Sequence, residues 1–172
     1  MKAAGCILIL IISTAAGMYA AGQFEKRVRQ LKELEKAVLI LQREIDYRLS
    51  PLGEALVHTG KRIFYPWNQF FIQAGEKILE KGKESIAPDE CFEEEIKRIT
   101  TYHPWEKDLN ILVSLGKNLG ELDKKMQLAK LSMTEEEIRQ AIDAAKEEQG
   151  KKGKLYQTLG VCMGVLGVIL MI

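Results

Sequence analysis

The sequence is poor in the residues on which catalytic and metal sites are built. Its 172 residues include only two histidines, His58 and His103, and three cysteines, Cys6, Cys91 and Cys162. No two cysteines have the close spacing of a zinc site, and two of them fall inside apolar runs, which argues against a disulfide framework. A glycine-rich phosphate loop, GxSxG and HExxH are all missing. We therefore predict no enzyme, no metal, no cofactor and no small-molecule substrate.

An excess of positive charge is also missing. Lysine and arginine together number 25, against 24 aspartates and glutamates, so nucleic acid is not an expected partner. The two acidic runs, Glu93–Glu95 and Glu135–Glu137, do not make a carboxylate site, because consecutive residues point around a helix. We interpret both runs as solvated helix faces.

The first end of the chain is apolar. Residues Ala3 to Gly22 carry no charged side chain, and their number is close to the ~20 residues that cross a hydrocarbon core as a helix. We predict a transmembrane helix at 1–22. A cleaved signal peptide is the alternative, with Lys2 as its positive end. Positive residues prefer the cytoplasmic side, and four of them follow this segment, which favours an uncleaved anchor: Lys26, Arg27, Arg29 and Lys32.

The other end repeats this pattern. Residues 155–172 are almost wholly apolar and follow Lys151, Lys152 and Lys154, so we predict a second transmembrane helix whose preceding side is again cytoplasmic. If this segment does not insert fully, its lysines still bind anionic membrane lipid. Three glycines lie on one face of the segment and predict close packing with the first membrane helix or with a second subunit, although glycine is also common in membrane helices in general: Gly160, Gly164 and Gly167.

The middle of the chain, residues 23–154, has the apolar spacing of amphipathic helices. One long stripe recurs at steps of three and four: Val28, Leu31, Leu34, Val38, Leu41, Ile45 and Leu49. Ser50 is predicted to cap a helix whose first residue is Pro51. That helix ends at Gly60, and a turn near Tyr65 and Pro66 leads to the aromatic-rich helix that begins around Trp67.

The later part of this region continues in the same way. A helix is expected to open at Ala87-Pro88-Asp89, and a long stripe runs from Trp105 toward the lysine cluster. Gly116 and Gly120 predict either a close helix crossing or a bend near Gly120. Two capping-box spacings mark a possible fresh helix start: Ser132 with Glu135, and Thr134 with Glu137.

No segment alternates with period two. The fold class is therefore all-α, a compact bundle of five to six helices between two transmembrane helices. The long stripes also raise the alternative of an intermolecular coiled coil, in a membrane-tethered dimerisation or signalling module. The frequent glycine and proline breaks favour short helices that fold back on one another.

The ordered features resemble the stage III sporulation protein AB family of endospore-forming bacteria. The resemblance is carried by Arg29-Gln30-Leu31 leading to Glu44-Ile45-Asp46-Tyr47 and Ser50-Pro51-Leu52-Gly53-Glu54-Ala55-Leu56, by Leu115-Gly116 through Leu119-Gly120 to Asp123 and Gln127, and by the Leu159-Gly160 tail. It implies six helices similar to the cytoplasmic domain of the type II secretion platform protein.

The resemblance also implies a function and a location. The protein would be a structural platform of a secretion-like channel between mother cell and forespore, in the mother-cell membrane around the forespore, with its soluble domain in the cytoplasm. Its implied partners are the secretion-type ATPase, stage III sporulation protein AA, and other membrane proteins of the channel. We expect charged helix faces to bind such a partner, with Arg43, Glu44 and Arg48 as the candidate surface.

Overall fold

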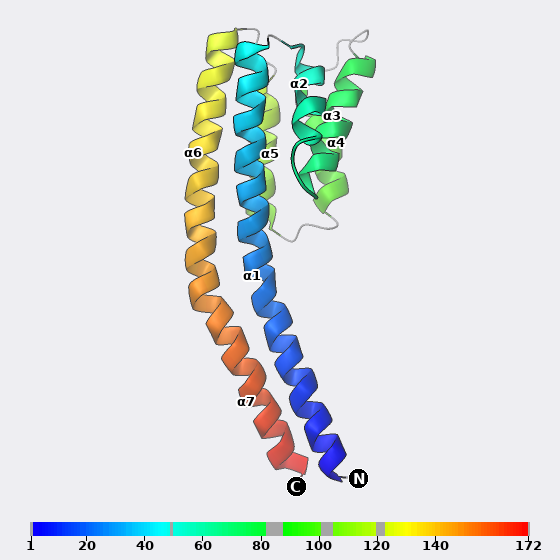
Figure 1. The fold of residues 1–172 in the computed structure, drawn as a ribbon, viewed down its shortest axis with the longest axis vertical. Helices are drawn as coiled ribbons and strands as arrows, with labels where there is room; N and C mark the ends of the chain where they lie inside the picture. The colour runs from blue at the N-terminus through cyan, green and yellow to red at the C-terminus, as the bar shows by residue number, and fades with distance from the viewer. Residues whose placement is uncertain (1, 49, 82–87, 101–104, 120–122, 172) are drawn as a thin grey trace. The chain divides into compact units, whose positions relative to one another are not determined.

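The computed structural model describes residues 2–48, 50–81, 88–100, 105–119 and 123–171, and these residues are helical with short connections (Figure 1). The helices are α1 (Lys2–Tyr47), α2 (Leu52–Gly60), α3 (Trp67–Lys81), α4 (Pro88–Thr100), α5 (Glu106–Leu119), α6 (Lys124–Glu148) and α7 (Lys154–Met171), with a π-helical segment, η1 (Gln149–Gly153), between the last two. No strand occurs in the ranges described, so the all-α prediction is confirmed.

The chain divides into two compact units. The bundle unit is residues 30–142, and the hairpin unit combines residues 1–29 with residues 143–172. The bundle unit holds the described helices α2 to α5 with the adjoining parts of α1 and α6. The predicted boundary between residues 22 and 23 falls inside α1, which continues without a break from one unit into the other.

Aromatic side chains form the centre of the bundle unit. Trp67, Phe70, Phe71 and Phe92 are all fully buried, and the Phe70 ring meets the rings of Phe71 and Phe92 edge to face, with centroids 5.4 and 5.1 Å away. The indole Nε1 of Trp67 donates a hydrogen bond to the carbonyl of Gln30 at 2.6 Å. This bond ties the start of α3 to α1 and satisfies a polar group that would be costly to bury alone.

Helices α2 and α3 approach each other through glycine. A Cβ added to Gly75 would lie 2.6 Å from the carbonyl oxygen of Gly53, and one added to Gly60 would lie 2.8 Å from the carbonyl oxygen of Asn68. Backbones come this close only where neither helix carries a side chain at the crossing. Sequence reasoning selected none of these three as a packing glycine, although it placed the end of a helix at Gly60.

Several predicted helix boundaries are confirmed and one is wrong. The end at Gly60, the start at Trp67 and the opening at Pro88 agree with the structure. Ser50 does not cap α2, however. Pro51 occupies the N-cap position, with φ −52° and ψ 143°, and its carbonyl accepts the first helical hydrogen bond, from Ala55 N at 3.0 Å. Proline already holds an extended conformation there, so the helix begins one residue later than predicted.

The predicted fresh start at Ser132 or Thr134 is also wrong. Helix α6 runs unbroken from Lys124 to Glu148. The hydroxyl of Ser132 donates to the carbonyl of Leu128, and that of Thr134 donates to the carbonyl of Lys130, both at 3.1 Å. A serine or threonine hydroxyl that donates to the carbonyl four residues earlier lies inside a helix. The same residue types therefore do not cap a helix start here.

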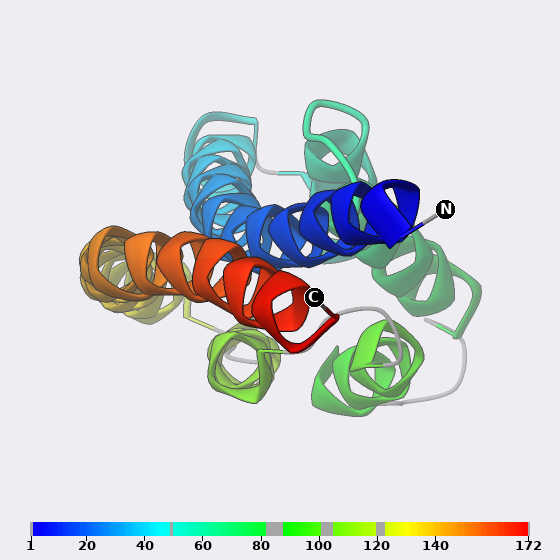
Figure 2. The ribbon, with the colours of Figure 1, turned by 90° about the horizontal axis from the view of Figure 1, so that it is seen from below.

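The hairpin unit consists of the N-terminal part of α1 and α7, which lie side by side with the two chain ends at the same end of the unit (Figures 1 and 2). A Cβ added to Gly160 would lie 2.9 Å from Cα of Gly17. Large apolar side chains face outward on both helices: Ile7, Leu8, Ile11, Ile12, Met18, Leu155, Leu159, Val161, Met163, Val165, Leu166 and Ile169.

By length and composition, α1 is able to cross a membrane. Its most apolar window, within Ile7–Tyr47, has a mean hydropathy of 1.7 and is only 17% buried. A core helix of a soluble protein and a signal sequence near the N-terminus pass the same test, and the low burial of this window distinguishes it from the core helix alone. Within the described residues the test selects α1 alone, so a membrane-crossing role for α7 stays a prediction.

Candidate functional site

The predicted surface at the end of α1 is built around a buried carboxylate. Glu44 is only 3% exposed. Its carboxylate lies 3.4 Å from the guanidinium of Arg48, 3.4 Å from that of Arg62 and 3.5 Å from Nδ1 of His58. We call these four residues the Glu44 cluster. Glu44 lies beneath the cations and is itself almost inaccessible, so Arg48 is the exposed member of the predicted surface in this cluster, and the surface itself stays a prediction.

The arrangement follows from helix geometry. Arg48 directly follows the last residue of α1, four positions after Glu44, and Arg62 lies in the turn after α2, four positions after His58. The ends of the two helices thus bring both guanidinium groups to the carboxylate. A buried carboxylate is expensive unless cations hold it. Arg48 and Arg62 do this while their side chains stay 56% and 54% exposed. Two permanent positive charges on one negative charge leave the cluster positive toward solvent.

Arg43 belongs to a neighbouring hollow. It is exposed and lines a depression of about 300 Å³ with Gln42, Asp46, Tyr47, Leu128 and Ser132. The ammonium of Lys124 meets the carboxylate of Asp46 at 2.9 Å. The hollow therefore offers an exposed arginine and the exposed ring of Tyr47 beside a paired aspartate.

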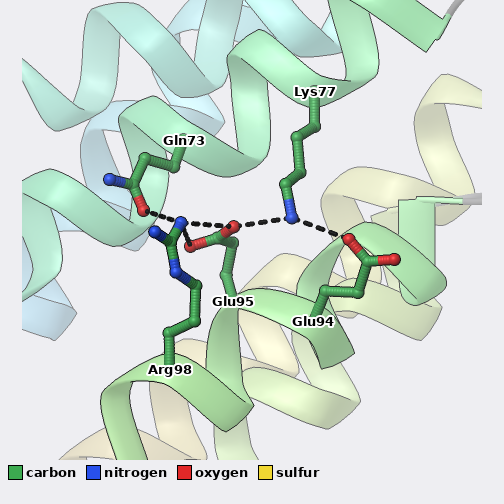
Figure 3. Close-up of polar contacts among 5 residues, drawn as sticks. All are labelled: Gln73, Lys77, Glu94, Glu95 and Arg98. Carbon is green, nitrogen blue, oxygen red and sulfur yellow. Dashed lines mark hydrogen bonds and ion pairs between the residues drawn. The ribbon is translucent and has the colours of Figure 1, made fainter.

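A second charged cluster joins α3 to α4 (Figure 3). Glu95 is only 1% exposed, and its carboxylate lies 2.8 Å from Lys77 Nζ and 3.4 Å from the guanidinium of Arg98. Lys77 also meets Glu94 at 2.7 Å, and Arg98 donates to the side-chain oxygen of Gln73 at 3.0 Å. We call these five residues the Glu95 cluster. It is electrically balanced, with two cations and two carboxylates.

The carboxylates change the titration of the lysine. Hydrogen bonds from Lys77 first to Glu94 and then to Glu95 raise the pKa of Lys77 above its ordinary value of 10.5, because they favour the charged ammonium. Beside the cluster lies a cavity of about 520 Å³, whose walls include Tyr65, Phe70, Glu95 and Arg98.

The interpretation of Glu93–Glu95 as a solvated run is wrong for Glu95. That residue follows Phe92 by three positions and precedes Ile99 by four, so it lies on the apolar face of α4. Its position in the stripe was the signal that sequence reasoning overlooked. Glu93 and Glu94 are exposed as expected.

The predicted packing glycines have different surroundings. A Cβ on Gly116 would lie 2.7 Å from Cβ of Phe92, so α5 crosses α4 closely at this glycine. Gly160, Gly164 and Gly167 all face α1, across from Gly17, Ser13 or Ile9. Gly120 lies outside the described residues.

Possible metal ligands do not gather: in the described ranges, no three histidine, cysteine or acidic side chains stand close enough to hold an ion. Both charged clusters consist instead of carboxylates held by cations. Together with the outward-facing apolar hairpin, they define a class of protein, a helical bundle with charged surface clusters joined to an apolar helical hairpin.

Comparison with known proteins identifies the family. The family model of stage III sporulation protein AB matches residues 2–172, so the chain belongs to the stage III sporulation protein AB family. The Bacillus subtilis (strain 168) stage III sporulation protein AB is 28% identical over 174 residues, covering 99% of each chain. A role in sporulation follows from this membership, and the names of these relatives specify no reaction.

A solved structure of a stage III sporulation protein AB has a similar fold. The TM-score is 0.65 at 23% sequence identity, and the match covers 73% of this chain and 98% of that one. The helical architecture of this chain is thus shared with an independently solved structure.

Proposed function

We propose that this protein is a membrane-anchored platform of the sporulation channel, and that it couples a cytoplasmic secretion-type ATPase, stage III sporulation protein AA, to membrane components of the same complex. The observation that carries the proposal is the opposite construction of the two units. One is a helical pair with an apolar exterior, and the other is a bundle with an apolar core and a positive surface cluster.

In this proposal α1 and α7 both cross the membrane, at 1–22 and 155–172, and residues 23–154 form the cytoplasmic domain. The outward-facing Leu155, Met163 and Ile169 of α7 find in lipid the apolar surroundings that water denies them. Lysines and arginines flank both spans on the side of the bundle unit, which the positive-inside rule assigns to the cytoplasm. During sporulation that side is the mother cell.

The topology is tested by thiol labelling in intact cells. Native Cys91 is buried, at 1% exposure, so it is a poor reporter. Met133 in α6 is 73% exposed, and we would place the reporter there as Met133→Cys, with the native cysteines replaced. A cytoplasmic domain predicts labelling by a membrane-impermeant reagent only after lysis. Labelling before lysis would place the domain outside and remove contact with a cytoplasmic ATPase.

The ATPase contact is assigned to Arg43 and to the exposed guanidinium of Arg48. Arg43→Glu should reduce recovery of the ATPase several-fold in a pull-down from the full-length chain. For Arg48 the substitution is Gln, because a glutamate would stand against buried Glu44 and unfold the site by charge repulsion. Lys107→Glu, an equally exposed reversal on α5, serves as the control. Equal recovery with Arg43→Glu and Lys107→Glu would refute this surface.

The mechanism is differential binding without catalysis by this chain. The ATPase performs work through the platform only if its nucleotide states bind the surface with different affinities. A pull-down in the presence of ATP and of ADP measures that difference directly.

The coiled-coil alternative has less support. Leu31, Leu34, Val38 and Leu41 of the long stripe are completely buried within a single chain, so they are not available to a second copy. Sedimentation of the full chain in detergent is expected to give a monomer at micromolar concentration.

A further inference from the structure

The hairpin unit contains a cavity at the point where its apolar segments end. It measures about 500 Å³ and lies between α1 and the η1–α7 junction. Met18 and Ala21 of α1 provide apolar wall, while Gln149, Lys154 and Gln157 provide polar wall from the other side. The α1 wall of the cavity is apolar apart from Glu25, and the opposite wall, which also includes Lys146, is rich in hydrogen-bond donors.

The backbone beside this cavity is unusual. Residues Gln149–Gly153 form a π-helical turn, a wide turn that is rare in helices and is frequent at functional sites. Gly150 and Gly153 line the cavity, and a Cβ added at either glycine would meet no atom within 4 Å. Packing therefore does not require glycine here, although each glycine costs about 1 kcal/mol of helix stability relative to alanine. Their effect is to leave room in the cavity.

The charges around the cavity favour an anion. In the described part of the chain, the ammonium of Lys154 makes no ion pair, whereas Lys146 meets Asp143 at 2.9 Å and Lys152 meets Glu148 at 3.0 Å. Lys154 is therefore the cavity lysine available to an anionic ligand. Glu25 also lines the cavity. Its carboxylate repels phosphate but accepts hydrogen bonds from hydroxyl groups, so a ligand with both groups fits this wall best.

The aromatics near the cavity are of the residue type that gathers at a membrane surface. The Tyr156 ring stacks on Phe24, with centroids 5.8 Å apart, and Tyr19 is 74% exposed. Tyrosine is enriched at the level of lipid headgroups. If α1 and α7 span the membrane, the cavity opens at that level, and its occupant comes from the bilayer.

We propose that this cavity, lined by Lys154, Gln149, Gln157 and the open glycine turn, binds the headgroup of an anionic, hydroxyl-bearing phospholipid such as phosphatidylglycerol. The Lys154 ammonium meets the phosphate, and the Glu25 carboxylate accepts from the glycerol hydroxyls. The inference rests on the proposed membrane anchoring and adds a lipid specificity to it.

The test is native mass spectrometry of the full-length chain, released from detergent after addition of phosphatidylglycerol or phosphatidylcholine. The expected preference for phosphatidylglycerol is about five-fold, the ratio that corresponds to ~1 kcal/mol for one lysine near an anionic surface. Lys154→Gln should abolish the preference. Lys152→Gln removes the same charge from the same segment but outside the cavity, and it should retain the preference.

A second variant tests the cavity without changing charge. Gly153→Leu projects a side chain into open space and should lower phosphatidylglycerol binding to the level of Lys154→Gln, whereas Thr158→Leu, on an exposed position of α7, should not. If Lys152→Gln and Lys154→Gln reduced the preference for phosphatidylglycerol equally, the inference would be overturned. The preference would then depend on the positive charge of the segment and not on the cavity. Binding of soluble glycerol phosphate as tight as that of the lipid would assign the cavity to a soluble ligand, and would overturn the inference as well.

Vesicle flotation separates this inference from the proposed function. A chain that floats with vesicles but shows no headgroup preference refutes the lipid site and leaves the anchor intact. A chain that floats with no vesicles refutes the anchor and, with it, the position of the cavity at a membrane surface.

Discussion

In the bundle unit most of the large apolar side chains point inward, whereas in the hairpin unit most of them lie on the outside. Trp67, Phe71 and Leu112 are completely buried, while Ile11, Met163 and Ile169 are each more than half exposed. Both units nevertheless use glycine where two helices cross, at Gly53 and Gly75 in one and at Gly17 and Gly160 in the other. Close backbone approach is thus common to both units, and they differ in where the bulky side chains lie.

The largest expected effect comes from truncating the aromatic core. Phe92→Ala should lower the free energy of unfolding of the bundle unit by about 3–5 kcal/mol, because it removes a fully buried ring and leaves a void. The measurement is denaturant unfolding of the full chain in detergent, followed by tryptophan fluorescence, since both tryptophans belong to the bundle unit. Leu166→Ala, 54% exposed in the hairpin unit, should leave the same transition nearly unchanged. Similar losses of unfolding free energy in both variants would show that the two units do not differ in where apolar side chains stabilise the fold.

A glycine substitution should have the next largest effect. Gly75→Ala places a methyl group within 2.6 Å of a carbonyl oxygen, so α2 and α3 must separate, at a cost of about 1–3 kcal/mol. Gly22→Ala, whose Cβ meets nothing within 4 Å, should be neutral or slightly stabilising. Equal unfolding midpoints for Gly75→Ala and wild type would show that the crossing is looser than the structure has it.

Neutralising the buried carboxylate of the Glu95 cluster should cost less. Glu95→Gln removes the negative charge that Lys77 and Arg98 share. Because these side chains are 27% and 64% exposed, hydration of the two cations compensates part of the lost ion pairing. The expected loss is about 1–2 kcal/mol in the same fluorescence assay. Glu93→Gln, an exposed neighbour on α4, should cause no measurable loss. A loss as large as that of Phe92→Ala would mean that ion pairs, and not apolar packing, dominate this unit.

The smallest effect is a pH dependence. The pKa of Lys77 is raised in the folded protein above its ordinary value of 10.5, so its ion pairs stabilise the fold below that value and are lost as the pH rises through the folded pKa. Lys77→Met should therefore lower stability near neutral pH by under about 1 kcal/mol, because the pair is partly exposed. The difference from wild type should shrink in alkaline solution. A difference that grows with pH would contradict the assignment.

Local pattern carried much of the sequence-based prediction. The helix ends at Gly60 and Pro88, the aromatic helix that begins at Trp67 and the apolar first segment of the chain are all visible in residue spacing and type, because helix period and turn chemistry are local properties. The resemblance to the sporulation family likewise depended on short ordered motifs. The capping prediction at Ser132 failed because the same residue types that cap a helix also bond back within one.

The sequence by itself therefore determined that the chain is helical, where several helices begin or end, and that it belongs to a sporulation family. Only the tertiary structure decided that Glu44 and Glu95 are buried under cations and that Gly53 and Gly75 meet across two helices. It also decided that the glycines of η1 border open space. The physical reason is that burial and close approach depend on residues far apart in the chain, and the spacing along one helix contains no information about which other helix will cover it.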